Sequence, residues 1–204
     1  LALDTCRAVN AQREDAGQTN RPGTLPIETQ LETLAKAIKG TVALFDDVTF
    51  EGNNIARLVP LLKKWGIEVT RVYVCVGIGE GIRRIEGLGI TVVCHKSFER
   101  VIDEFCERDF YPGVPRSGRQ LIDSSVGLPY VEPFGNAHKW ASIPEADVAS
   151  FSKFCIGQTI DLFFEIERVS DRTVRCRDIP RGLQLERPWQ EYGDVRFVDL
   201  LREF

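Results

Sequence analysis

The sequence is poor in residues that commonly hold metal ions. It contains only two histidines, His95 and His138, and six cysteines, none of which forms a C-x-x-C pair. Structural zinc sites take four cysteine or histidine ligands at short, regular spacings, so the sequence argues against such a site. Cys75 and Cys94 lie inside apolar runs, which is typical of reduced, buried thiols in an intracellular protein.

Strong charge of one sign and long apolar segments are also absent. The chain has 26 Lys and Arg against 30 Asp and Glu, which gives a net charge of −4. A field this weak disfavours general nucleic-acid binding. No apolar run approaches the roughly 20 residues that a membrane-spanning helix needs, and no basic-then-apolar leader is present. We therefore expect a cytoplasmic protein that binds neither membranes nor nucleic acids in general.

Short apolar strands alternate with amphipathic helices in the middle of the chain. Residues 41–45, 69–76 and 90–94 have the composition of buried strands. Apolar side chains between these runs recur at three and four positions, which predicts helices over 55–65, 82–88 and 97–105. This order predicts an α/β fold, a Rossmann-like parallel sheet flanked by helices. Ligands of such sheets bind at the C-terminal ends of the strands.

The flanking segments are harder to read. Residues 27–38 have helical spacing, whereas residues 8–21 are polar and suit either a helix or a disordered stretch. A further helix is expected to begin at Pro144. These features predict an α/β domain over residues 1–143 and a mainly helical C-terminal extension over residues 144–204, packed on the same domain.

The segment after the first predicted strand suits the binding of a sugar phosphate. Asp46 and Asp47 follow the apolar run directly, and their carboxylates can accept hydrogen bonds from a ribose diol or hold a hydrated Mg²⁺. A turn that contains Gly52 comes next and leads into a helix. Backbone N–H groups at a helix N-terminus, together with the helix dipole, form a receptor for phosphate.

Residues 43–54 resemble the phosphoribosyl-pyrophosphate motif of the type I phosphoribosyltransferases: an apolar strand, an Asp-Asp pair, a few residues rich in Ser or Thr, then Gly. The resemblance implies that Asp46 and Asp47 form the catalytic pair, contact the ribose hydroxyls and bind Mg²⁺. It implies a 5′-phosphate wrapped by Thr49, Phe50, Glu51, Gly52, Asn53 and Asn54. It also implies a pentosyltransferase that moves ribose 5-phosphate from phosphoribosyl pyrophosphate to a nitrogenous base or related acceptor.

Two features depart from the family pattern. Phe50 and Glu51 stand where the family usually has small hydroxyl residues, and a Glu beside a phosphate repels it unless the side chain points away. No copy of the family's upstream pyrophosphate loop is found in residues 1–40. A second hypothesis is therefore a non-catalytic sensor or assembly module of the same fold that binds a nucleotide or phosphoribosyl pyrophosphate. A separate structural alternative for Asp46 and Asp47 is a solvated strand end and a helix cap, without a ligand.

Residues 108–119 form a second candidate segment, rich in Gly, Pro and Arg. Arg116 and Arg119 suit bidentate contacts with pyrophosphate, and Phe110 or Tyr111 suits stacking on a base. Phosphoribosyltransferases hold the base with segments that follow the third strand, so the order along the chain agrees. The structural alternative is a rigid surface loop with stacked arginine side chains.

The remaining motifs point less directly to chemistry. Gly77, Gly79 and Gly81 lack the further glycine of a dinucleotide fingerprint, because Ile82 occupies that position, and they are interpreted as a tight turn. A phosphohydrolase related to the haloacid dehalogenases is disfavoured, since the acids lack an Asp-x-Asp spacing. The aromatic residues of the C-terminal half are expected in the core or in a homo-oligomer interface: Trp140, Phe151, Phe154, Phe163 and Phe164.

Overall fold

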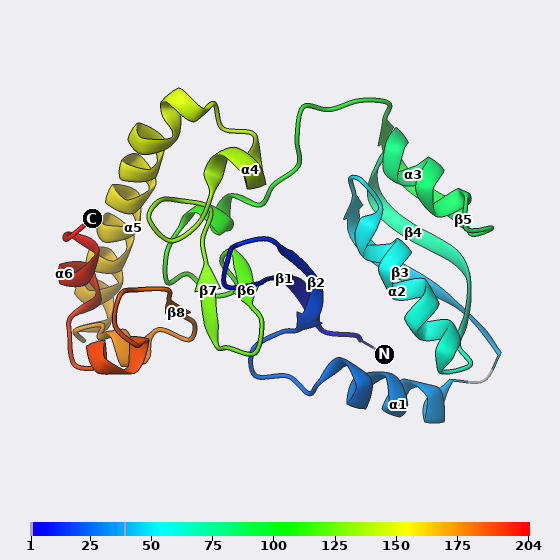
Figure 1. Ribbon diagram of the computed structural model, residues 1–204, viewed down its shortest axis with the longest axis horizontal. Coiled ribbons are helices and arrows are strands. Elements are labelled where there is room, and N and C mark those ends of the chain that lie inside the picture. Colours follow the sequence, from blue (N-terminus) through cyan, green and yellow to red (C-terminus); the bar gives the residue numbers. More distant parts are fainter. Residues whose placement is uncertain (1, 39) are drawn as a thin grey trace. The chain divides into compact units, whose positions relative to one another are not determined.

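The computed structural model describes residues 2–38 and 40–204, and the chain forms two compact units (Figure 1). Unit 1 contains the chain up to Thr5 together with Gly23–Glu104, and unit 2 contains Cys6–Pro22 together with Phe105–Phe204. The division thus falls after Glu104 and not at the predicted residue 143. The reason is that Phe110, Tyr130 and Trp140 share one hydrophobic core with the C-terminal helices.

Unit 1 has the predicted alternation of strands and helices. Its three strands form a parallel sheet in the order β3-β4-β5, and helices connect them, an α/β arrangement compatible with a Rossmann-like fold. The elements are α1 (Ile27–Ala37), β3 (Thr41–Thr49), α2 (Asn53–Lys64), β4 (Glu68–Ile78), α3 (Gly79–Glu86) and β5 (Thr91–Phe98).

The core of unit 1 lies on one face of this sheet. Val72 and Val74 of β4 are buried against apolar side chains of the helices, among them Leu31, Leu62 and Ile85. Alternate strand residues point to the opposite face. There Phe45 is 79% exposed and Val93 is 42% exposed, so the opposite face has an uncovered apolar patch.

The predicted helix over residues 97–105 is absent. Strand β5 continues to Phe98, which lies opposite Ile78 of β4, and residues 99–106 are irregular. Ile102 is 95% exposed, and Phe105 packs edge-on against Phe110 within unit 2. A short amphipathic helix depends on packing for its stability. The apolar side chains of this segment do not pack against one common surface, so the helix that their spacing predicts does not form.

Unit 2 is built around a five-stranded mixed sheet in the order β2-β1-β6-β7-β8. The polar residues 8–21, expected as helix or disorder, contribute to its first two strands. The strands are β1 (Thr5–Val9), β2 (Asp15–Asn20), β6 (Arg119–Leu121), β7 (Val126–Leu128) and β8 (Gly182–Leu183). The helices are η1 (Glu107–Phe110), α4 (Ala137–Ala141), η2 (Glu145–Asp147), α5 (Val148–Ser170), η3 (Cys176–Asp178), η4 (Trp189–Tyr192) and α6 (Phe197–Leu201).

The predicted helix after Pro144 is present as η2 and α5. Trp140 and Phe163 are buried in the core of unit 2, and Phe151 and Phe164 pack against that core. Phe154 is 62% exposed and lies outside it. Within the described part of the chain, no helix has the length and apolar character needed to cross a membrane.

Candidate functional site

The twin acids lie inside β3 and not beyond its end. Pairing with β4 continues to Thr49, which lies opposite Gly77, and Asp46 lies opposite Val74. Because successive side chains of a strand point to opposite faces, Asp46 points to the same face as Leu44 and Asp47 to the same face as Phe45. A ligand that contacts both carboxylates must therefore approach the exposed strand from its end or edge.

Both carboxylates accept hydrogen bonds from the backbone beside them. The N–H of Asp47 donates to Oδ1 of Asp46 at 3.1 Å, and the N–H of Val48 donates to Oδ1 of Asp47 at 2.9 Å. Both residues are exposed. Among the ion pairs of the described residues, none involves either acid, so a carboxylate oxygen of each is open to a ligand.

Asp46 has a higher pKa than an ordinary aspartate. Its pKa is raised to about 6, chiefly because surrounding groups partly shield the carboxyl group from water, although the residue as a whole is exposed. The N–H of Asp47 opposes the shift, whereas the carboxylates of Asp47 and Glu104 add to it. A nearby cation or sugar hydroxyl would favour the ionised form and lower the pKa again.

The loop between β3 and α2 meets the beginning of α3. Gly52 caps α2 with φ 75°, and a Cβ atom at this position would lie 2.9 Å from the carbonyl oxygen of Gly81. A Cβ atom at Gly81 would in turn collide with the carbonyl oxygen of Phe50. The two backbones approach so closely that only glycine fits. The N-termini of α2 and α3 therefore lie side by side at the C-terminal edge of the sheet.

Side chains of the loop bond to one another. Nδ2 of Asn53 donates to the Glu51 carboxylate, and Nη1 of Arg84 donates to Oδ1 of Asn53 at 2.8 Å. Arg84 also pairs with Glu80 at 3.1 Å. Thr49 is buried, with 3% of its surface exposed. The predicted phosphate loop thus places a carboxylate beside the α2 N-terminus, and Arg84 supplies a positive charge close by.

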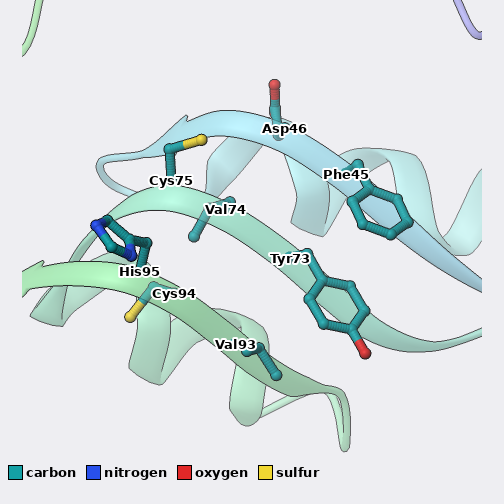
Figure 2. Close-up of a pocket in the computed structure, with 8 residues that line it drawn as sticks. All are labelled: Phe45, Asp46, Tyr73, Val74, Cys75, Val93, Cys94 and His95. Atoms are coloured by element: carbon teal, nitrogen blue, oxygen red, sulfur yellow. The ribbon is translucent and has the colours of Figure 1, made fainter.

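A shallow pocket of about 310 Å³ lies over the strands of unit 1 (Figure 2). Its lining residues are Phe45, Asp46, Tyr73, Val74, Cys75, Val93, Cys94 and His95. The rings of Phe45 and Tyr73 are stacked, with centroids 4.8 Å apart and planes inclined by 10°. Figure 2 shows Cys75 and His95 at the other end. Asp46 borders this pocket, but residues 49–54 do not.

A magnesium ion at this site would need ligands from outside the protein. In residues 2–38 and 40–204, no three His, Cys, Asp or Glu side chains converge in a metal-binding group. Mg²⁺ commonly binds through one or two carboxylates and completes its shell with water and substrate phosphates. The open oxygens of Asp46 and Asp47 fit that mode, and they do not fit a site made by the protein alone.

The second predicted segment lies in unit 2. Phe110 is 4% exposed and packs against the rings of Tyr130 and Phe151, so its side chain belongs to the core. Tyr111 is half-buried, and Arg116 is exposed with φ 66°. The guanidinium of Arg119 lies over the ring of Tyr130. Base or pyrophosphate contacts by this segment therefore remain a prediction for Tyr111, Arg116 and Arg119.

Sequence reasoning missed three charged residues beside Arg119. Asp109 and Arg181 are buried, and Arg7 forms an ion pair with Asp109 at 3.6 Å. No local pattern could join these residues, because Arg7 and Arg181 lie near opposite ends of the chain. Of the three, only Asp109 lies within the segment 108–119 that the sequence singled out.

Neither a protein-family model nor a curated protein matches the chain. Among solved structures, the chain is similar to an orotate phosphoribosyltransferase from Aeropyrum pernix, with 31% sequence identity and a TM-score of 0.28. The similarity covers 29% of this chain and 36% of that one. The match thus spans little more than a third of that enzyme, and with this TM-score it carries no argument about fold or function.

Proposed function

We propose that unit 1 binds the ribose 5-phosphate part of phosphoribosyl pyrophosphate and that the chain is a phosphoribosyltransferase-like enzyme. The observation that carries the proposal is the pair of exposed acids that precedes two adjoining helix N-termini. Asp46 and Asp47 are free of ion pairs in the described structure, and Gly52 bends the chain into α2. Carboxylates suit a ribose diol, and the helix N-termini suit a phosphate.

The proposed reaction is a displacement at C1 of the ribose. The bond from C1 to the pyrophosphate oxygen breaks, and a bond from C1 to a nitrogen of the acceptor forms. The proton of that nitrogen passes to the departing pyrophosphate or to water. Positive charge develops on the ribose ring, and the carboxylates of Asp46 and Asp47 would stabilise it. Mg²⁺, when bound, supplies charge neutralisation to the leaving pyrophosphate.

Isothermal titration with phosphoribosyl pyrophosphate and Mg²⁺ tests the binding step. We expect saturable binding to the unaltered chain and a loss of about tenfold or more, roughly 1.4 kcal/mol, in Asp46→Asn/Asp47→Asn. Asp161→Asn is the matched control, because Asp161 is an exposed acid on α5 in unit 2. Absence of heat with the unaltered chain, or equal affinity of the double variant, would contradict the proposal.

One observation favours the second hypothesis, a non-catalytic binding module. Glu51 occupies a position beside the α2 N-terminus where the resembled family has small hydroxyl residues, and its carboxylate accepts a hydrogen bond from Asn53. A fixed negative charge there opposes the approach of a highly charged ligand. The module predicts binding without pyrophosphate release when a panel of bases is supplied. Release of pyrophosphate with any one base would favour the enzyme instead.

A further inference from the structure

Arg7 and Arg119 are neighbours across two strands of unit 2. Strands β1 and β6 are parallel, with Ala8 opposite Gln120 and Val9 opposite Leu121. Arg7 and Arg119 stand one step earlier in this register, so their side chains leave the same face of the sheet. Like charges that lie directly opposite on adjacent strands repel one another. The pairing is therefore unfavourable unless another group compensates it.

Both guanidinium groups lie against the same aromatic residue. Cζ of Arg7 is 5.8 Å from the ring centroid of Tyr130, and Cζ of Arg119 is 5.6 Å from it. Arg119 also lies 4.9 Å from the ring of Trp140, and its Nε is 3.4 Å from the Tyr130 hydroxyl. A guanidinium stacked on a ring keeps N–H groups available at its edge. The rings thus hold the two cations together and leave donors for an anion.

Two buried charges fix the backbone around Arg119. Oδ1 of Asp109 accepts the N–H of Gly118 at 2.9 Å, while Oδ2 pairs with Arg7. Arg181, which is 6% exposed, donates to the carbonyl oxygens of Ser117 and Gly118 at 2.7 and 3.2 Å. It also donates to Oε1 of Gln120 at 2.8 and 3.0 Å. The residues on both sides of Arg119 are therefore held, which orients its side chain in advance.

Positive charge is in excess in this network. Arg7, Arg119 and Arg181 accompany one buried carboxylate, Asp109. Arg119 forms no ion pair with any residue that the structure describes, and Arg7 has only the 3.6 Å contact with Asp109. Burial raises the pKa of Asp109, although Arg7, Arg108 and Arg181 act to lower it. The neighbouring arginines favour the charged form of Asp109. Even when it is charged, this single carboxylate does not neutralise the three guanidinium groups.

We propose that the Arg7–Arg119 pair is a binding site for a phosphate group. A phosphate between the two guanidinium groups would accept charge-assisted hydrogen bonds from both and remove their repulsion. Tyr130 and Trp140 would form the floor of the site, and Asp109 would act as a positioning residue for both arginines. All of these residues belong to unit 2, so the proposal stands apart from the ribose-phosphate site proposed in unit 1.

Titration of the full chain with sodium phosphate at constant ionic strength tests the site, with heat and tryptophan fluorescence as readouts. We expect saturable binding and a loss of about tenfold in each of Arg119→Gln and Arg7→Gln. Arg187→Gln is the matched control, since Arg187 lies 4.7 Å over the ring of Tyr192 elsewhere in unit 2. Unchanged affinity in both Gln variants, or an equal loss in the control, overturns the proposal.

A parallel titration with ribose 5-phosphate distinguishes inorganic phosphate from a phosphate carried on a sugar. The one that binds with the higher affinity is the better match to the site. Binding of either one that persists in Asp46→Asn/Asp47→Asn supports the site in unit 2. If that variant loses phosphate binding, the anion belongs to unit 1 and the inference fails. Should the Gln variants not fold, thermal unfolding of Asp46→Asn/Asp47→Asn decides. Stabilisation of that variant by phosphate beyond that by chloride of equal ionic strength supports the site in unit 2, and equal stabilisation overturns it.

Discussion

The two units of this protein treat their charged groups in opposite ways. In unit 1, Asp46 and Asp47 are exposed on a strand and accept hydrogen bonds from the backbone N–H group of the next residue. In unit 2, Asp109 and Arg181 are buried and bond to segments distant in sequence. Exposed charges with few bonds contribute little to stability and remain available to a ligand, whereas buried charges with many bonds hold the fold.

The largest expected effect is on the buried arginine of unit 2. Arg181→Met would leave the carbonyl oxygens of Ser117 and Gly118 without their donor, and the free energy of unfolding should fall by about 3 kcal/mol or more. Denaturant unfolding measures this loss. Arg187→Met, a change at an exposed arginine, should alter stability by less than about 0.5 kcal/mol. Equal losses in the two variants would show that Arg181 does not hold the network.

A smaller effect is expected at the contact between the β3–α2 loop and α3. Gly52→Ala would force a methyl group against the carbonyl oxygen of Gly81, in addition to the cost of φ 75°, so we expect a loss of about 2 kcal/mol. Gly66→Ala is the control, because φ is 73° there and the surrounding space is open. The control should lose only about 1 kcal/mol in a denaturant titration. If both variants lose the same amount, the close approach does not constrain the loop.

The smallest expected effect concerns the pH dependence of unit 1. The pKa of Asp46 is raised to about 6 in the folded chain, above its value in the unfolded chain. Its contribution to stability is then fully present below the unfolded pKa and is lost as the pH rises through about 6. Asp46→Asn should thus be more stable than the unaltered chain at pH 7.5 by up to about 1 kcal/mol, an amount limited by solvent screening.

Thermal unfolding at pH 4 and pH 7.5 measures the difference that Asp46→Asn makes. The two proteins should agree more closely at the lower pH, because Asp46 is then largely protonated. A variant that is less stable at pH 7.5 would indicate that the charged carboxylate has a favourable partner, contrary to the contrast between the units.

Sequence periodicity predicted unit 1 well because its elements are local and amphipathic. The apolar runs of β4 and β5 and the helical face of α2 were predicted correctly, whereas the helix expected over residues 97–105 is absent. The extension of β3 through Asp46 and Asp47 was not predicted. Acidic residues are uncommon in strands, and pairing with β4 holds these two in the strand.

Unit 2 was poorly predicted for a related physical reason. Strands β6 and β7 have three residues each, too few for a periodic pattern, and they depend on partners far along the chain. The candidate loop in unit 1 was visible because residues 43–54 are contiguous. The Arg7–Arg119 pair could not be predicted from the sequence, because the two residues become neighbours only through the pairing of β1 with β6.

The discontinuity of unit 2 has a consequence for protein synthesis. Residues 6–22 are synthesised before Gly23–Glu104, and β6, the strand that pairs with β1, is synthesised only after that stretch. The continuous stretch can acquire its hydrophobic core while translation proceeds, since domains generally fold as units during synthesis. During that time β1 and β2 have been synthesised, but the edge of β1 that pairs with β6 has no partner strand. Chaperone protection during this interval would matter most for Cys6–Pro22.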